Sequence, residues 1–179
     1  MKIAECDIIF IADEEKNGKS HWMSRWADRF PNSFSMNAGL TQKSNERLEV
    51  LFEIMKETTR PVIFVAQGEG ILLLSQALSG LTSFPVRGAF LVSPVMPDRN
   101  IPDSRECQRE YHQQGFPFKA ILVASQTDES YSAEYAKNLG KLWNIPVLDA
   151  GEAGGLDEKS GHGPWPEGLM SFAKFLQTV

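Results

Sequence analysis

The chain alternates short apolar runs with segments in which apolar residues recur every three or four positions. Apolar runs rich in β-branched residues are typical of strands that are buried on both faces of a sheet. Such runs stand at residues 7–12, 62–66, 86–94 and 118–125, and shorter ones stand at 33–36 and 145–148. Pro146 lies in the last run and predicts an edge strand, because proline cannot donate a hydrogen bond to a ladder.

Between these runs the spacing of apolar residues predicts helices, over 21–30, 45–58, 71–78, 133–142 and 169–176. In the first of them Trp22, Trp26 and Phe30 fall four residues apart, so they share one face and are expected to pack in the core. Ser20 precedes this helix and is its expected N-cap.

Strands that alternate with helices predict an α/β protein with three α/β/α layers and a mostly parallel central sheet. The alternation runs through the whole chain, so residues 1–179 are expected to form one domain. In such sheets, ligands bind beyond the carboxyl ends of the strands. The loops that follow the predicted strands are therefore expected to meet at one rim, where the functional site should lie.

Composition narrows the function classes. Hydrophobic residues make up 42% and charged residues 23% of the chain, as in an ordinary globular protein. The net charge of −5 and the lack of a basic run argue against nucleic acid as a partner. No apolar run approaches the ~20 residues of a membrane span, and charges interrupt any signal-peptide core at the N-terminus, so a cytoplasmic protein is expected.

Metal and cofactor motifs are not evident in the sequence. Cys6 and Cys107 lie far apart and form no zinc pattern, and Cys6 is expected to be a core thiol. The glycine pattern at Gly68 and Gly70 fits neither of the common phosphate-binding loops. No cofactor is therefore expected.

The most informative stretch is Gln67-Gly68-Glu69-Gly70, which separates a predicted buried strand from an apolar helix. So short a connection requires a sharp turn with glycines where the backbones crowd. The serine of a hydrolase nucleophile elbow, G-x-S-x-G, stands on such a turn, but here the pattern is A-Q-G-E-G. A glycine-containing turn of this kind also occurs in many other α/β proteins.

Two further motifs accompany this turn, S-H-W-M-S-R-W at 20–26 and S-G-H-G-P-W-P-E-G at 160–168. Together the three segments resemble the small serine hydrolases related to retinoblastoma-binding protein 9, and the similarity spans nearly the whole chain. The resemblance implies a compact α/β-hydrolase fold and, for an intact member, a serine hydrolase activity.

Residue by residue, the resemblance implies a degenerate catalytic triad. The family's nucleophile falls at Gly68 and its base at Gly155, while its acid is retained as Asp128. The turn that helps to build the family's oxyanion hole reads Ala12-Asp13-Glu14-Glu15 instead of P-G-x-G. Glycine offers neither an oxygen that can attack nor a nitrogen that can accept a proton.

The carboxylates of Asp13, Glu14, Glu69 and Asp128 are expected around the same rim. One carboxylate ~5 Å from an oxyanion costs ~3 kcal/mol at an effective dielectric constant of ~20, so this rim would oppose the family's transition state. The four residues follow no defined metal-site spacing.

The leading hypothesis is therefore a catalytically inert α/β-hydrolase-fold protein, a pseudoenzyme that binds a small molecule or a protein partner. An alternative is a hydrolase of small esters with a displaced nucleophile, for which Ser93, Ser125 and His162 are the candidates because they lie at or near the same rim. A weaker alternative is a binder of cations or amines at the acidic rim.

Overall fold

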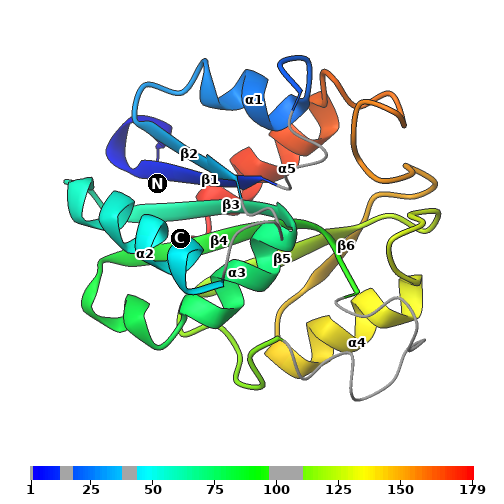
Figure 1. Ribbon diagram of the computed structural model, residues 1–179. Helices are drawn as coiled ribbons and strands as arrows, with labels where there is room; N and C mark the ends of the chain where they lie inside the picture. Colours follow the sequence, from blue (N-terminus) through cyan, green and yellow to red (C-terminus); the bar gives the residue numbers. More distant parts are fainter. Residues whose placement is uncertain (1, 13–17, 38–43, 97–110) are drawn as a thin grey trace.

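The computed structural model describes residues 2–12, 18–37, 44–96 and 111–179. Its centre is a six-stranded parallel sheet in the order β2-β1-β3-β4-β5-β6 (Figure 1). The strands are β1 (Asp7–Ala12), β2 (Ser33–Asn37), β3 (Val62–Gly68), β4 (Val86–Pro94), β5 (Lys119–Ala124) and β6 (Val147–Asp149). The parallel sheet is confirmed, and β6 with Pro146 before it is an edge strand, as expected.

Helices cover both faces of this sheet (Figure 1). One face carries α1 (Trp22–Ala27) and α5 (Pro166–Leu176), and the other carries α2 (Ser44–Glu57), α3 (Glu69–Ala77) and α4 (Ala133–Trp143). The described residues also contain two 3₁₀ helices, η1 (Ile3–Glu5) and η3 (Gly80–Ser83). The three-layer α/β/α architecture is confirmed. Within the described ranges, no helix is long and apolar enough to cross a membrane.

The central strand β3 is buried along its whole length. Ile63 and Val65 face the core beneath α1 and α5, whereas Phe64 and Ala66 face the core beneath the other three helices. Because both faces are covered, the strand carries an unbroken apolar run rather than an alternating one. This burial fixes the position of its last residue, Gly68.

The helix α1 differs from the sequence prediction at both ends. Its N-cap is His21, whose ring Nδ1 accepts a hydrogen bond from the Met23 N–H at 3.2 Å, so the expectation of Ser20 was wrong. A neutral imidazole nitrogen can act as the cap acceptor in place of a hydroxyl. The helix ends at Ala27, so Phe30 lies beyond it, although its ring still stacks on Phe172 with the centroids 6.1 Å apart.

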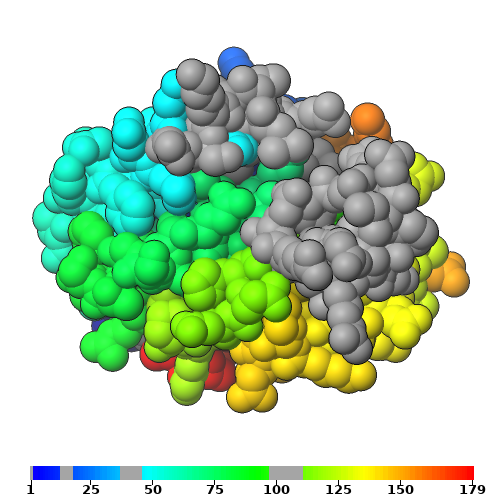
Figure 2. All heavy atoms as spheres, turned by 60° about the horizontal axis from the view of Figure 1, so that its bottom comes forward, coloured from blue at the N-terminus to red at the C-terminus, as the bar shows by residue number. Residues whose placement is uncertain are grey.

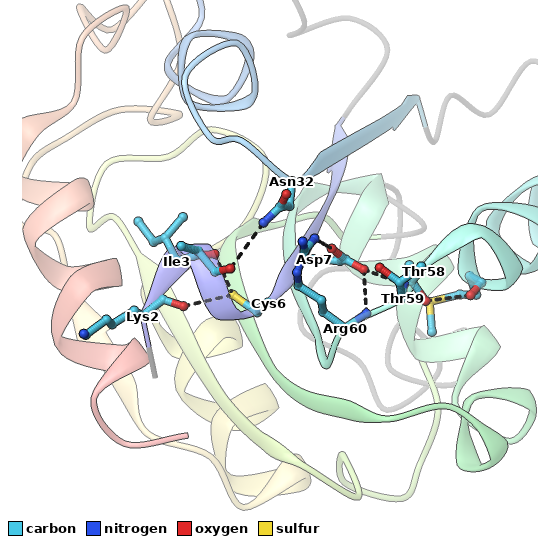
Figure 3. Close-up of polar contacts among 10 residues, drawn as sticks. Lys2, Ile3, Cys6, Asp7, Asn32, Thr58, Thr59 and Arg60 are labelled. Atoms are coloured by element: carbon cyan, nitrogen blue, oxygen red, sulfur yellow. Dashed lines mark hydrogen bonds and ion pairs between the residues drawn. The ribbon is translucent and has the colours of Figure 1, made fainter.

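Asp7 fixes the start of β1 against the turn before β3 (Figure 3). Its carboxylate is almost fully buried and accepts hydrogen bonds from the backbone N–H groups of Thr59 at 2.7 Å and Arg60 at 2.9 Å. The Arg60 guanidinium adds an ion pair at 3.2 Å. A buried carboxylate is tolerated only when it is paired and hydrogen-bonded in this way. The contacts hold the neighbouring strands β1 and β3 in register.

The neighbouring Cys6 is a buried thiol, as the sequence predicts, and its Sγ lies 3.4 Å from the Ile3 carbonyl (Figure 3). Burial, reinforced by the Asp7 carboxylate, raises the pKa of the Cys6 thiol from 9.0 to about 11. The unfolded thiol therefore ionises at a lower pH than the folded one. The contribution of this group to stability is complete below pH 9 and declines as the pH rises toward about 11.

We expect Cys6 to resist alkylation in the folded chain, because the thiolate is the reactive form and the side chain has no exposed surface. The Cys107→Ser variant leaves Cys6 as the one thiol to be followed. Iodoacetamide at pH 8 should leave the native variant unlabelled within an hour by mass spectrometry and should label it fully in urea. Rapid labelling of the native variant would contradict the burial of the thiol.

Candidate functional site

The turn from β3 to α3 has the sharp geometry that the sequence predicts. Gly68 is the last residue of β3, and Glu69 begins α3. Gly68 has φ 56° and ψ −122°, a conformation that costs ~1–3 kcal/mol for a residue with a side chain. A Cβ on Gly70 would lie 2.2 Å from the Ile11 carbonyl oxygen, so only glycine lets α3 pack this closely on β1.

The residue before the turn, Gln67, joins β3 to the loop that precedes α5. Its side chain is buried, and its Nε2 donates to the carbonyls of Gly155 at 3.3 Å and Leu156 at 3.2 Å. The Trp22 indole donates to the same Leu156 carbonyl at 2.8 Å. These contacts bring Gly155 next to the end of β3, although the two segments are almost 90 residues apart in sequence.

Ser93 and Asp128 are in direct contact. Ser93 Oγ donates to Asp128 Oδ2 at 2.6 Å and lies 3.3 Å from the Gly155 carbonyl. A hydroxyl has one proton, and the short distance to the carboxylate indicates that the proton goes there. The other Asp128 oxygen accepts from the Ser130 N–H at 2.8 Å. Ser93 has φ 49° and is only 1% exposed, so this serine is held in a strained and buried position.

Tyr131 lies beside this pair. Burial, followed by the charge of Asp128, raises the pKa of the Tyr131 hydroxyl to about 12. The same hydroxyl oxygen accepts a hydrogen bond from the Ser125 N–H at 2.8 Å. Ser125 Oγ donates to the Gly151 carbonyl at 3.2 Å and accepts from the Ala153 N–H at 3.0 Å. Ser125 thus braces the loop after β6.

His162 makes its contacts elsewhere. Its Nδ1 lies 3.4 Å from Ser160 Oγ, and its ring stands at right angles to Trp165 with the centroids 6.3 Å apart. Across the part of the chain that the structure describes, His162 has no hydrogen bond to Ser93 or Ser125. The structure brings Ser93, Asp128 and Gly155 together and leaves His162 with its own loop.

Of the expected acidic rim, the structure describes two members. Glu69 is half-buried in the first turn of α3, and Asp128 follows β5. Asp13 and Glu14 lie outside the described residues. Within those residues, no group of His, Cys, Asp and Glu side chains is arranged to hold a metal ion.

Sequence reasoning missed Gln67 and Tyr131 as members of this site. Gln67 carried a weak signal, since it is a polar residue at the end of a buried apolar strand, where its amide needs partners. Tyr131 carried none. The residue after it, Ser132, is the N-cap of α4, and its Oγ accepts from the Tyr135 N–H at 3.1 Å.

Solved structures resemble this chain closely in fold. A protein described as a YdeN-like hydrolase, from Pectobacterium atrosepticum, is 22% identical with a TM-score of 0.84, and the match covers 98% of this chain and 92% of that protein. The ydeN gene product of Bacillus subtilis is 14% identical with a TM-score of 0.65, covering 96% and 99%. The esterase domain of a Rhodothermus marinus protein is 10% identical with a TM-score of 0.65, covering 91% and 83%.

At these identities the likeness shows a shared α/β-hydrolase fold. No curated protein matches the sequence. The family model described as serine hydrolase matches residues 12–174, which is nearly the whole chain. The chain belongs to the serine hydrolase family.

Proposed function

We propose that residues 1–179 form one serine-hydrolase-like domain that has lost hydrolytic chemistry and acts as a binding protein for a small molecule or a protein partner. The observation that carries the proposal is the conformation of Gly68, which keeps a sharp elbow turn but has no side chain to present on it. In this assignment Gly68 is the position of the lost nucleophile, Gly155 that of the lost base, and Asp128 the retained acid.

The clustering of these three positions supports the assignment. The Gly155 carbonyl accepts a hydrogen bond from Gln67, the residue before Gly68, and lies 3.3 Å from Ser93 Oγ. Ser93 Oγ in turn donates a hydrogen bond to Asp128. A triad requires its members to lie in one place and in hydrogen-bond reach. In this proposal the chain keeps the positions of a triad without the reactive atoms, as a degenerate relative of the retinoblastoma-binding protein 9 group would.

The partners of Asp128 support inertness. In a working triad the acid carboxylate accepts a hydrogen bond from the imidazole and orients it. Here both carboxylate oxygens already accept hydrogen bonds, from Ser93 and from the Ser130 N–H. Glycine at position 68 also relieves the strain that a nucleophile would bear there, as expected when no side chain is needed. No cofactor enters this proposal.

The second candidate function is hydrolysis of small esters with Ser93 as the nucleophile and Asp128 as its base. The 2.6 Å hydrogen bond between them favours it. The burial of Ser93 stands against it, since an attacking oxygen must reach a substrate carbonyl. Binding of a cation or amine at the acidic rim has less support, because both oxygens of Asp128 are engaged.

Covalent labelling separates the first two candidates. We expect no serine to be labelled by a fluorophosphonate probe and no burst of nitrophenolate from p-nitrophenyl acetate, because Gly68 and Gly155 supply neither nucleophile nor base. Intact-mass and peptide mass spectrometry detect any adduct. Stoichiometric labelling of Ser93 that disappears in Ser93→Ala would replace the proposal with the second candidate.

A further inference from the structure

A cleft of about 590 Å³ lies at the amino ends of β5 and β6, at the opposite end of β5 from Asp128. Three segments line it, at 116–121, 143–148 and 171–178. Figure 2 shows these lime, orange and red segments meeting at the lower edge of the molecule. Pockets that hold small organic ligands have volumes of roughly 300–1,000 Å³, so the cleft has a ligand's size.

The floor of the cleft is apolar because α5 leaves part of the sheet uncovered. Phe172 and Phe175 of α5 contact Phe90 in β4, with ring centroids 5.3 and 6.1 Å apart. The helix therefore lies over β4, and Ile121 of β5 and Leu148 of β6 stay partly exposed. Leu148 is 38% exposed, one of only a few large apolar side chains at the surface of the described residues.

The charged residues that line the cleft are all cationic. They are Lys119, at the start of β5, and Lys174, in the last turn of α5, and the lining includes no Asp or Glu side chain among the described residues. Lys119 Nζ donates to the carbonyl of Thr178, another residue of the cleft lining, which fixes this ammonium group there and leaves it further protons to donate. The chain has a net charge of −5, so a concave surface with two lysines and no acidic side chain differs in the sign of its charge from the protein as a whole.

We propose that this cleft binds an amphipathic monocarboxylate, with its apolar chain on Ile121 and Leu148 and its carboxylate between Lys119 and Lys174. Apolar contact supplies the affinity, and the two ammonium groups give specificity for a negatively charged ligand. Small-molecule sites usually combine an apolar lining with a few polar groups in this way. The inference does not depend on the function proposed above, because the cleft and Gly68 lie at opposite ends of the sheet.

Titration calorimetry with octanoate and with the neutral 1-octanol tests the charge selection. We expect saturable 1:1 binding of octanoate, about tenfold tighter than that of octanol. In Lys119→Ala/Lys174→Ala the octanoate affinity should fall about tenfold while octanol is unaffected. Lys174→Glu, which keeps the Lys119 contact, should weaken octanoate as well. The matched control is Lys56→Ala, a 62% exposed lysine on the far face of the sheet.

The location is tested by Leu148→Asp, which should abolish binding of both ligands, and by the methyl NMR signals of Ile121 and Leu148, which octanoate should shift. A melting curve for each variant shows that it is folded. Equal affinity for octanoate and octanol, absence of saturable heat, or shifts confined to residues near Gly68 would each overturn the proposal. So would a dimer in sedimentation that Leu148→Asp dissociates, since a second copy would then occupy the cleft.

Discussion

The variant Gly68→Ser/Gly155→His/Ser93→Ala is expected to hydrolyse p-nitrophenyl acetate at least about a hundredfold faster than the parent chain. Under the proposed assignment, the first two changes restore the nucleophile and the base, and Gly155 lies beside the end of β3, where Gly68 stands. The third frees Asp128 Oδ2 from the 2.6 Å hydrogen bond of Ser93, so that it can accept one from the new imidazole. Steady-state kinetics and fluorophosphonate labelling of the serine introduced at position 68 measure the result.

The local geometry allows these substitutions at a moderate cost. A Cβ on Gly155 would lie 2.9 Å from Asp157 Oδ2, so this carboxylate, whose other oxygen accepts hydrogen bonds from Ser160, must shift slightly. Gly155 is not among the described glycines with positive φ. Serine at position 68 must adopt φ 56°, so we expect the free energy of unfolding to fall by ~1–3 kcal/mol. Urea denaturation measures that loss.

The matched control is Gly68→Ala/Gly155→His/Ser93→Ala, which bears the same backbone strain and the same imidazole but no nucleophile, and should be inactive. Each single substitution should also be inactive, because the residues of a triad act as a unit. A folded triple variant without activity or labelling would show that Gly155 is not the position of the base. Full activity in Gly68→Ser alone would show that another base serves the elbow.

The Trp22→Ala variant is expected to lose about 4 kcal/mol of unfolding free energy. Trp22 has no exposed surface, and its ring packs edge-on against Trp26 at 4.7 Å and Trp165 at 4.9 Å between centroids. Truncation removes these contacts and the hydrogen bond to the Leu156 carbonyl. Urea denaturation followed by far-UV circular dichroism measures the change.

Two comparisons separate packing from the hydrogen bond. Trp22→Phe keeps an aromatic ring and loses the indole N–H, so it should cost about 1–3 kcal/mol. Met170→Ala, on the outer side of α5 where Met170 is 62% exposed, should change stability by less than about 0.5 kcal/mol. A loss below about 1 kcal/mol in Trp22→Ala would show that the contacts of Trp22 with Trp26 and Trp165 contribute little to the free energy of unfolding.

The sheet could be predicted from the sequence because its strands are buried on both faces. Val62 to Ala66 had to be apolar throughout, and an unbroken run of this length between two helical patterns is typical of a buried parallel strand. The end of α1 was harder to predict. Phe30 keeps the four-residue spacing that marks a helical face, but it reaches the core from a turn after Ala27, and spacing alone does not distinguish a helix from such a turn.

The sequence predicted the turn at Gly68 and named Ser93 and Asp128 as candidates, but it did not predict the contact between these two side chains. The glycines of the turn at Gly68 follow from how little room a strand-to-helix turn leaves, and the structure has that turn. The contact of Ser93 with Asp128 joins residues 35 positions apart and depends on the left-handed φ of Ser93. No propensity favours that conformation for serine, so it is a result of tertiary packing that sequence patterns do not express.

The packing of Trp22 and Trp26 against residues of α5 and the loop before it also limits when α1 can reach its native contacts during synthesis. Trp22 and Trp26 are covered by Trp165 and Phe172, which are translated well over a hundred residues later, and Trp22 and Leu156 are joined over 134 residues. At a synthesis rate of ~5–20 residues per second, both indole rings lack these native contacts for on the order of ten seconds after they are translated. During that interval the nascent chain presents an apolar surface to the cell, and chaperones that bind exposed tryptophans are expected to engage it at α1.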